Sequence, residues 1–130
     1  MLDADVLIAN ERGVFDLDRW LAAQQDNDFE LAALTAAELW HGLERAIEPF
    51  RSRRQAYIER TLGFCTIVPY TLSTARIHAR LWAELESAGK PIGAHDLIVA
   101  ATAVERGVPV ATFNTKHFSQ VRGLTVIVPS

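Results

Sequence analysis

Four polar residues of this sequence have the types and positions needed to bind a metal ion. Asp3 lies in LDADVLIA, Glu38 in LTAAELW, Asp96 in IGAHDLIVAATA and Asn114 in VATFNTKHF. Carboxylates that are brought together repel one another and lose hydration, and a divalent cation offsets both costs. Oxygen ligands favour Mg²⁺ or Mn²⁺ over zinc or copper. Because a carboxylate-bound Mg²⁺ activates water for attack on a phosphodiester, these residues are candidates for a hydrolytic site.

The elements predicted around these residues bring them to one edge of a sheet. We expect strands over residues 28–34, 64–70, 108–113 and 124–128, and a short first strand that ends at Asp3 and turns into a helix. We expect further helices over residues 14–25, 35–46, 51–63, 71–89 and 94–107, and a loop or short helix over 114–123. Alternating strands and helices indicate an α/β sandwich with a mostly parallel sheet. In such sheets the site lies beyond the carboxyl ends of the strands, where all four residues would meet.

Each of these residues also has a purely structural interpretation. Thr35 and Glu38 fit a capping box in which Thr35 is the N-cap of a helix that ends near Pro49. Asp96 would favour a helix N-terminus through the helix dipole, as Asp5 would. Asn114 is a common turn residue. The shared predicted edge is what favours a functional role for the set.

The histidines have no spacing that predicts metal binding. His95 and His117 neighbour Asp96 and Asn114 in the sequence, so we place them at the rim of the site without a direct chemical role. His41 and His78 are expected to be packing or surface residues.

Composition limits the class of protein. The length of 130 residues fits one domain spanning residues 1–130, and the net charge of −3 argues against a passive nucleic-acid coat. The single cysteine, Cys65, indicates a reducing compartment and is interpreted as a core residue. The sequence contains neither a long apolar run nor a signal peptide, so we expect a cytoplasmic protein. Four arginines between residues 51 and 60 are interpreted as a solvated helix face.

Three stretches of the sequence resemble the successive motifs of PIN-domain ribonucleases, and within them the VapC toxins. They are LDADVLIA, LTAAELWHGLERA and PIGAHDLIVAATAVERGVPVATFNTKHF. The resemblance implies a three-layer α/β/α PIN-like fold and a Mg²⁺-dependent endoribonuclease in which Mn²⁺ can substitute. It also implies a toxin that arrests translation or growth, a homodimer, and inhibition by a VapB-like antitoxin.

The same resemblance assigns the site residues. Asp3, Glu38 and Asp96 match the acidic positions of the family motifs and would be the metal ligands. Asn114 stands at a fourth catalytic position that is often Asp, and its neutral amide brings no charge there.

An acidic chain that acts on RNA needs local attraction for its substrate. We expect Lys116 and Arg122 to provide it at the rim of the cleft, with the cluster from Arg51 to Arg54 as a further candidate.

Two other functions fit parts of the sequence. Asp3 and Asp5 also resemble the nucleophile and acid/base of a haloacid-dehalogenase-type phosphatase, but neither Lys90 nor Lys116 is followed by the acidic pair that this family needs. A catalytically inactive PIN-like module that binds RNA or protein is the second alternative.

Overall fold

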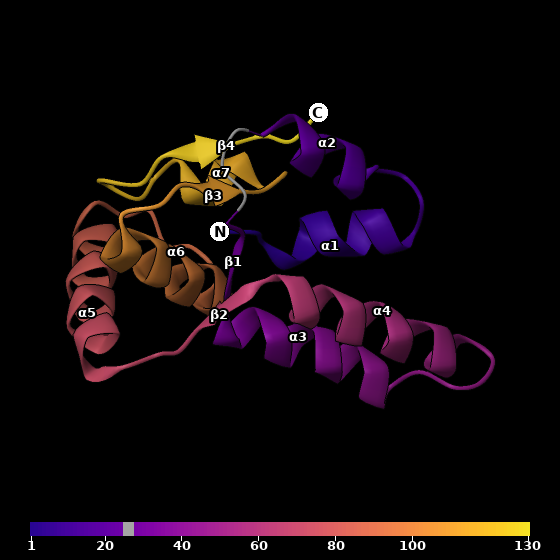
Figure 1. Cartoon of the computed structure of the whole chain (residues 1–130). Coiled ribbons are helices and arrows are strands. Elements are labelled where there is room, and N and C mark those ends of the chain that lie inside the picture. Colours follow the sequence, from indigo (N-terminus) through magenta and orange to yellow (C-terminus); the bar gives the residue numbers. More distant parts are fainter. Residues whose placement is uncertain (25–27) are drawn as a thin grey trace.

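The computed structural model describes residues 1–24 and 28–130, which form helices packed around short strands (Figure 1). The helices are α1 (Ala4–Glu11), α2 (Leu17–Ala23), α3 (Ala33–Glu44), α4 (Phe50–Phe64), α5 (Leu72–Ser87), α6 (Ala94–Arg106) and α7 (Thr115–Phe118). The strands are β1 (Glu30–Ala32), β2 (Thr66–Val68), β3 (Val110–Ala111) and β4 (Val126–Ile127).

Residues 1–3 join two strand pairs into one sheet. Strand β1 pairs with β2, and β3 pairs with β4, both in parallel. Between them, the Leu2 N–H donates to the Glu30 carbonyl at 2.9 Å, and the Asp3 N–H donates to the Ala111 carbonyl at 3.0 Å. The sheet order is therefore β2, β1, residues 1–3, β3 and β4, and the predicted mostly parallel sheet is confirmed.

Helices cover both faces of this sheet, so the predicted three-layer α/β/α arrangement is confirmed. Figure 1 shows α5 and α6 together on one side and the antiparallel pair of α3 and α4 on the other. The core on the first side is built from apolar residues of α5, α6, β3 and α7, including Leu81, Leu85, Val99, Val110 and Phe118. The core on the second side is formed by helices α1, α2, α3 and α4 with strand β1. It includes Leu7, Leu17, Leu31, Leu39 and Ile58, and Cys65 is partly buried against it.

The predicted helix ends are partly wrong at α3. This helix begins at Ala33, directly after β1, and has Ala32 as its N-cap without a side-chain hydrogen bond. Thr35 is a buried residue of the first turn, so it is not the cap of a capping box with Glu38. The helix ends at Glu44, and Pro49 is instead the residue that precedes α4. Strand β1 ends at Ala32, and the apolar residues that follow it form the first turn of α3. The N-cap is therefore Ala32, three residues before Thr35.

The other predicted helices and strands are present, with shorter strands than the sequence suggests. The helix predicted over 14–25 is observed over Leu17–Ala23, and Gln25 lies outside the described residues. Gly107 ends α6 with a φ of +66°, a left-handed conformation that glycine adopts without strain. Among the described helices, none is long and apolar enough to cross a membrane.

Candidate active site

Asp3 stands where the central strand passes into α1. It is the N-cap of this helix, and its Oδ1 accepts the Ala4 N–H at 2.9 Å. Its Oδ2 accepts a hydrogen bond from the Thr112 hydroxyl at 2.8 Å. The side chain is buried, with only 6% of the residue exposed. A strand end followed at once by a helix start therefore fixes this carboxylate from two directions.

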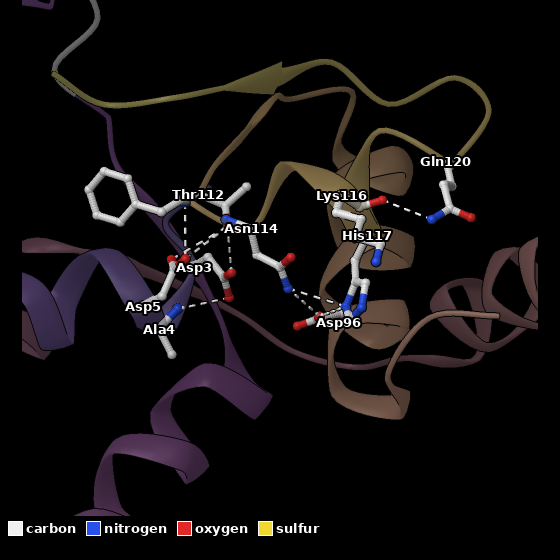
Figure 2. A network of polar contacts seen from close by, with 10 residues as sticks. Asp3, Ala4, Asp5, Asp96, Thr112, Asn114, Lys116, His117 and Gln120 are labelled. Atoms are coloured by element: carbon white, nitrogen blue, oxygen red, sulfur yellow. Dashed lines mark hydrogen bonds and ion pairs between the residues drawn. The ribbon is translucent and has the colours of Figure 1, made fainter. Parts of the chain in front are cut away.

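Thr112, at the end of β3, connects Asp3 with Asp5. Its buried hydroxyl lies 3.2 Å from the Asp5 Oδ2 and accepts the Asn114 N–H at 2.9 Å. Asp5 Oδ2 also accepts the Phe113 N–H at 3.0 Å. Figure 2 shows Asp3, Asp5 and Thr112 gathered at this edge of the sheet. Asp5 is thus part of the site as well as a charge in the first turn of α1.

Asp96 forms a second group with Asn114 and His117. Asp96 lies in the first turn of α6, and its Oδ2 accepts the Asn114 Nδ2–H at 3.1 Å. The same oxygen lies 2.8 Å from His117 Nδ1. In Figure 2 the Asn114 side chain extends from the Asp3 side of the site toward Asp96 and His117. The structure therefore brings Asp3, Asp96 and Asn114 to one edge, as the strand and helix pattern predicts.

Glu38 approaches the site from the second turn of α3. Its side chain is 30% exposed, and its Oε1 lies 3.9 Å from His95 Nδ1. Burial raises the pKa of Glu38, the nearby His95 lowers it, and the charges of Asp96 and Asp5 raise it further. The influence of both aspartates places Glu38 in the same electrostatic field as the other carboxylates.

Asp3 is the most strongly affected acid. Burial, followed by the charge of Asp5 and then of Asp96, raises the pKa of Asp3 to about 7, while hydrogen bonds from Thr112 and Ala4 act in the opposite direction. The groups that lower this pKa are hydrogen-bond donors rather than cations. The acidic cluster is therefore under-compensated, which is the environment that a bound cation relieves.

The donor set fits a hydrated divalent ion better than a fully caged one. Within residues 1–24 and 28–130, no three carboxylate, imidazole or thiol groups converge closely enough to ligate one ion directly. Mg²⁺ commonly keeps several waters and takes one or two carboxylates, which suits the separated positions of Asp3, Asp96 and Glu38. The chemistry of the cluster thus agrees with an ion held partly through water.

The basic residues named from the sequence divide into two kinds. Lys116 is exposed in α7, one residue from His117, whereas Arg122 lines a hollow with Leu81 and Leu85 of α5. A role in RNA binding stays a prediction for both.

The arginines of α4 do more than face solvent. Arg54 Nε donates to Glu11 Oε1 at 2.8 Å, and Arg51 Nη1 donates to the Leu43 carbonyl at 2.7 Å. These contacts tie α4 to α1 and α3. The interpretation as a solvated face is wrong for Arg51 and Arg54, since long side chains on a helix also bridge to neighbouring helices.

Thr112 and the contact between His117 and Asp96 were not apparent from the sequence. Thr112 is a polar residue directly after a buried strand and two positions before Asn114. That position in the sequence indicates a residue at the same edge of the sheet as Asn114. Asn114 and His117 are three residues apart at a helix start, a spacing that puts both side chains on one face. Neither signal identifies the partner carboxylate, because Asp96 is distant in the sequence.

Comparisons with known proteins agree with this architecture. Residues 1–124 match the PIN domain family. The chain is 30% identical over 131 residues to Ribonuclease VapC1 of Rickettsia felis, covering 100% of this chain and 96% of that protein. It is 34% identical over 139 residues to the VapC ribonuclease Y4jK of Sinorhizobium fredii, covering 99% of this chain and 97% of the relative.

Solved structures share the fold over nearly the whole chain. VapBC2 from Rickettsia felis, bound to a DNA fragment from its promoter, aligns with a TM-score of 0.88 at 21% identity, covering 98% of this chain and 96% of that one. FitAcB from Neisseria gonorrhoeae aligns with a TM-score of 0.81 at 28% identity, with the same coverage. PIN-domain ribonucleases generally depend on a divalent metal ion. Because residues 1–124 match the family and the similarity to these ribonucleases extends over nearly the whole chain, this chain belongs to the PIN-domain family.

Proposed function

We propose that the protein is a metal-dependent endoribonuclease and the toxin of a VapBC-type toxin–antitoxin pair. The observation that carries this proposal is a set of hydrogen bonds at the carboxyl edge of the sheet, in which Thr112 contacts Asp3 and Asp5 and Asn114 contacts both Thr112 and Asp96. Glu38 lies near enough for the charges of Asp96 and Asp5 to raise its pKa. Full-length relatives that bear the name ribonuclease support RNA as the substrate. Membership of the PIN family removes the support for the phosphatase alternative.

The proposed metal ligands are Asp3 and Asp96, with Glu38 completing the acidic set. Mg²⁺ is the proposed ion and Mn²⁺ its substitute, since both are hard cations suited to carboxylate oxygens. When bound, the ion supplies charge neutralisation at the phosphate and a more acidic water. Thr112 holds Asp3 in place, and Asn114 orients Asp96 through its amide N–H.

The proton from the attacking water has nearby acceptors in the chain itself. Glu38 is partly exposed, and burial raises its pKa above the ordinary value, which makes it a stronger proton acceptor than a fully solvated carboxylate. Lys116, at the exposed start of α7, is proposed to attract the RNA phosphates.

The proposed partner is a VapB-like antitoxin. Solved structures that share this fold are described as VapBC2 from Rickettsia felis and VapBC from Salmonella typhimurium, each bound to DNA. An antitoxin would inhibit by presenting an arginine or lysine to Asp3, Glu38 and Asp96 in place of the metal ion. We further propose a homodimer acting in the cytoplasm, with residues 1–130 as a single domain.

Cleavage of total cellular RNA with and without a chelator tests the proposal. Wild type should cleave RNA in Mg²⁺ and stop in EDTA, and Asp96→Asn should fold normally but abolish cleavage. Asp18→Asn, the same chemical change on the exposed face of α2, is the matched control and should cleave normally. If wild type binds RNA in Mg²⁺ without cutting it, the inactive binding module is the better description.

A further inference from the structure

Two side-chain nitrogens, from Asn114 and His117, lie within hydrogen-bond distance of the same carboxylate oxygen of Asp96. Asp96 Oδ2 lies 3.1 Å from Asn114 Nδ2 and 2.8 Å from His117 Nδ1. Both partners come from the start of α7, whereas Asp96 belongs to α6. The start of α7 therefore holds the Asp96 carboxylate through Oδ2 alone.

The chemistry of the three groups fixes the direction of these bonds. An ionised carboxylate only accepts hydrogen bonds, and the amide nitrogen of Asn114 only donates. His117 Nδ1 must therefore carry a proton to bond Asp96, which makes its 3.2 Å approach to Asn114 Nδ2 a contact between two donors. Asn114 and His117 lie this close to each other because both donate to the same oxygen of Asp96.

This arrangement explains why an amide suits position 114 better than a carboxylate. An aspartate there would face Asp96 with a second negative charge, while Asn114 offers an N–H to it. His117 adds a shorter bond to the same oxygen, with its side chain 37% exposed and that of Asp96 23% exposed. With Oδ2 occupied, Oδ1 is the Asp96 oxygen left to face a cation.

We infer that His117 is a positioning residue for the metal site, which holds Asp96 together with Asn114 so that one carboxylate oxygen is presented to the divalent ion. The inference rests on the proposed function, because it assumes that Asp96 takes part in binding the ion. Groups that orient a ligand in this way typically change metal affinity by roughly 10- to 100-fold when they are removed.

Mn²⁺ binding, measured by isothermal titration calorimetry without RNA, tests this inference separately from catalysis. His117→Ala should weaken Mn²⁺ binding by about tenfold, while thermal unfolding in EDTA confirms that the variant folds. His117→Asn keeps an N–H donor near the position of Nδ1 and should restore most of the affinity. His78→Ala is the matched control, since His78 of α5 makes its side-chain contact with the Tyr70 hydroxyl, at 2.8 Å, rather than with a proposed metal ligand. Its Mn²⁺ affinity should stay within about twofold of wild type.

The ring nitrogens of His117 supply a second measurement. In ¹⁵N spectra at alkaline pH, where imidazole is neutral, His117 should carry its proton on Nδ1, the tautomer that is less common in free histidine. A proton on Nε2 instead, or equal Mn²⁺ affinity of wild type and His117→Ala, would overturn the inference while leaving the proposed ribonuclease intact. A wild-type chain that binds no Mn²⁺ would overturn both the inference and the metal ligands of the proposed function.

Discussion

At the scale of single residues, Asp3 serves both the fold and the site. Its Oδ1 caps α1, and its Oδ2 is held by Thr112 at the centre of the acidic cluster. The position of Asp3 was predictable, because an acid directly after an apolar stretch marks a strand end. Its neighbour across the sheet was not, because Thr112 lies more than a hundred residues further along the chain, and only the paired strands bring the two together.

The raised pKa of Asp3 predicts a pH dependence of stability for the metal-free protein. Between the ordinary value of 3.8 and about 7, the folded state binds more protons at Asp3 than the unfolded state does. The free energy of unfolding should therefore be highest below this window and fall as pH rises through it, by at most roughly 4 kcal/mol. Asp3→Asn, which keeps a capping side chain, should lose this fall.

Urea unfolding in EDTA across a pH series measures this difference. The stability of Asp3→Asn relative to wild type should increase from acid to neutral pH, and saturating Mg²⁺ should reverse the order by stabilising wild type. Parallel pH profiles for the two proteins would show that Asp3 is not the group responsible.

At the scale of elements, helix patterns were easier to predict than helix starts. The amphipathic spacing of α5 and the glycine after α6 identify these helices, because periodicity and a left-handed C-terminal residue are local properties. The start of α3 depends instead on how few residues β1 needs to pair with β2. That length is set by tertiary contacts, so Thr35 looked like a cap although it lies inside the helix.

The buried hydroxyl of Thr35 predicts a stabilising substitution in α3. Thr35 is fully buried, and its Oγ1 has no hydrogen-bond partner among the described residues. Thr35→Val replaces the hydroxyl with a methyl group of similar size, so the free energy of unfolding should rise by about 1 kcal/mol. Thr102→Val in α6 is the control, because the Thr102 hydroxyl donates to the Ile98 carbonyl at 2.7 Å, and this variant should gain nothing. Chemical denaturation of both variants decides the matter, and a loss of stability in Thr35→Val would contradict the prediction.

At the scale of the whole molecule, charge has to be local to be useful. The net charge of −3 repels a polyanion at long range, so attraction must come from cations close to the acidic site. The sequence predicts Lys116 to be such a cation, but it does not reveal that Arg51 and Arg54 make contacts between helices. Which cations are available to a substrate depends on packing, and composition alone does not report it.

Lys116→Glu should weaken RNA binding, and the effect should be larger at low salt. Screening already reduces the contact of the lysine with phosphate at high salt, and the loss of one phosphate contact should lower the salt slope by about 0.7 for single-stranded RNA. Filter binding in Ca²⁺, which suppresses cleavage, at two salt concentrations measures this. Lys90→Glu, the same change in the exposed loop before α6, is the control. Equal affinities of Lys116→Glu and wild type at low salt would remove Lys116 from the RNA path.

The position of residues 1–3 in the middle of the sheet has a consequence for the timing of folding. The Asp3 N–H and the Met1 carbonyl both pair with Ala111, so the central strand lacks one neighbour until β3 has been synthesised. Contacts this distant in sequence close late and slowly. A nascent chain that ends at Gly107 should therefore show no cooperative unfolding in pulse proteolysis, whereas a chain that includes β4 should. The acidic site therefore cannot assemble before the segment that carries Thr112 and Asn114 has been synthesised, because these residues hold Asp3 and Asp96.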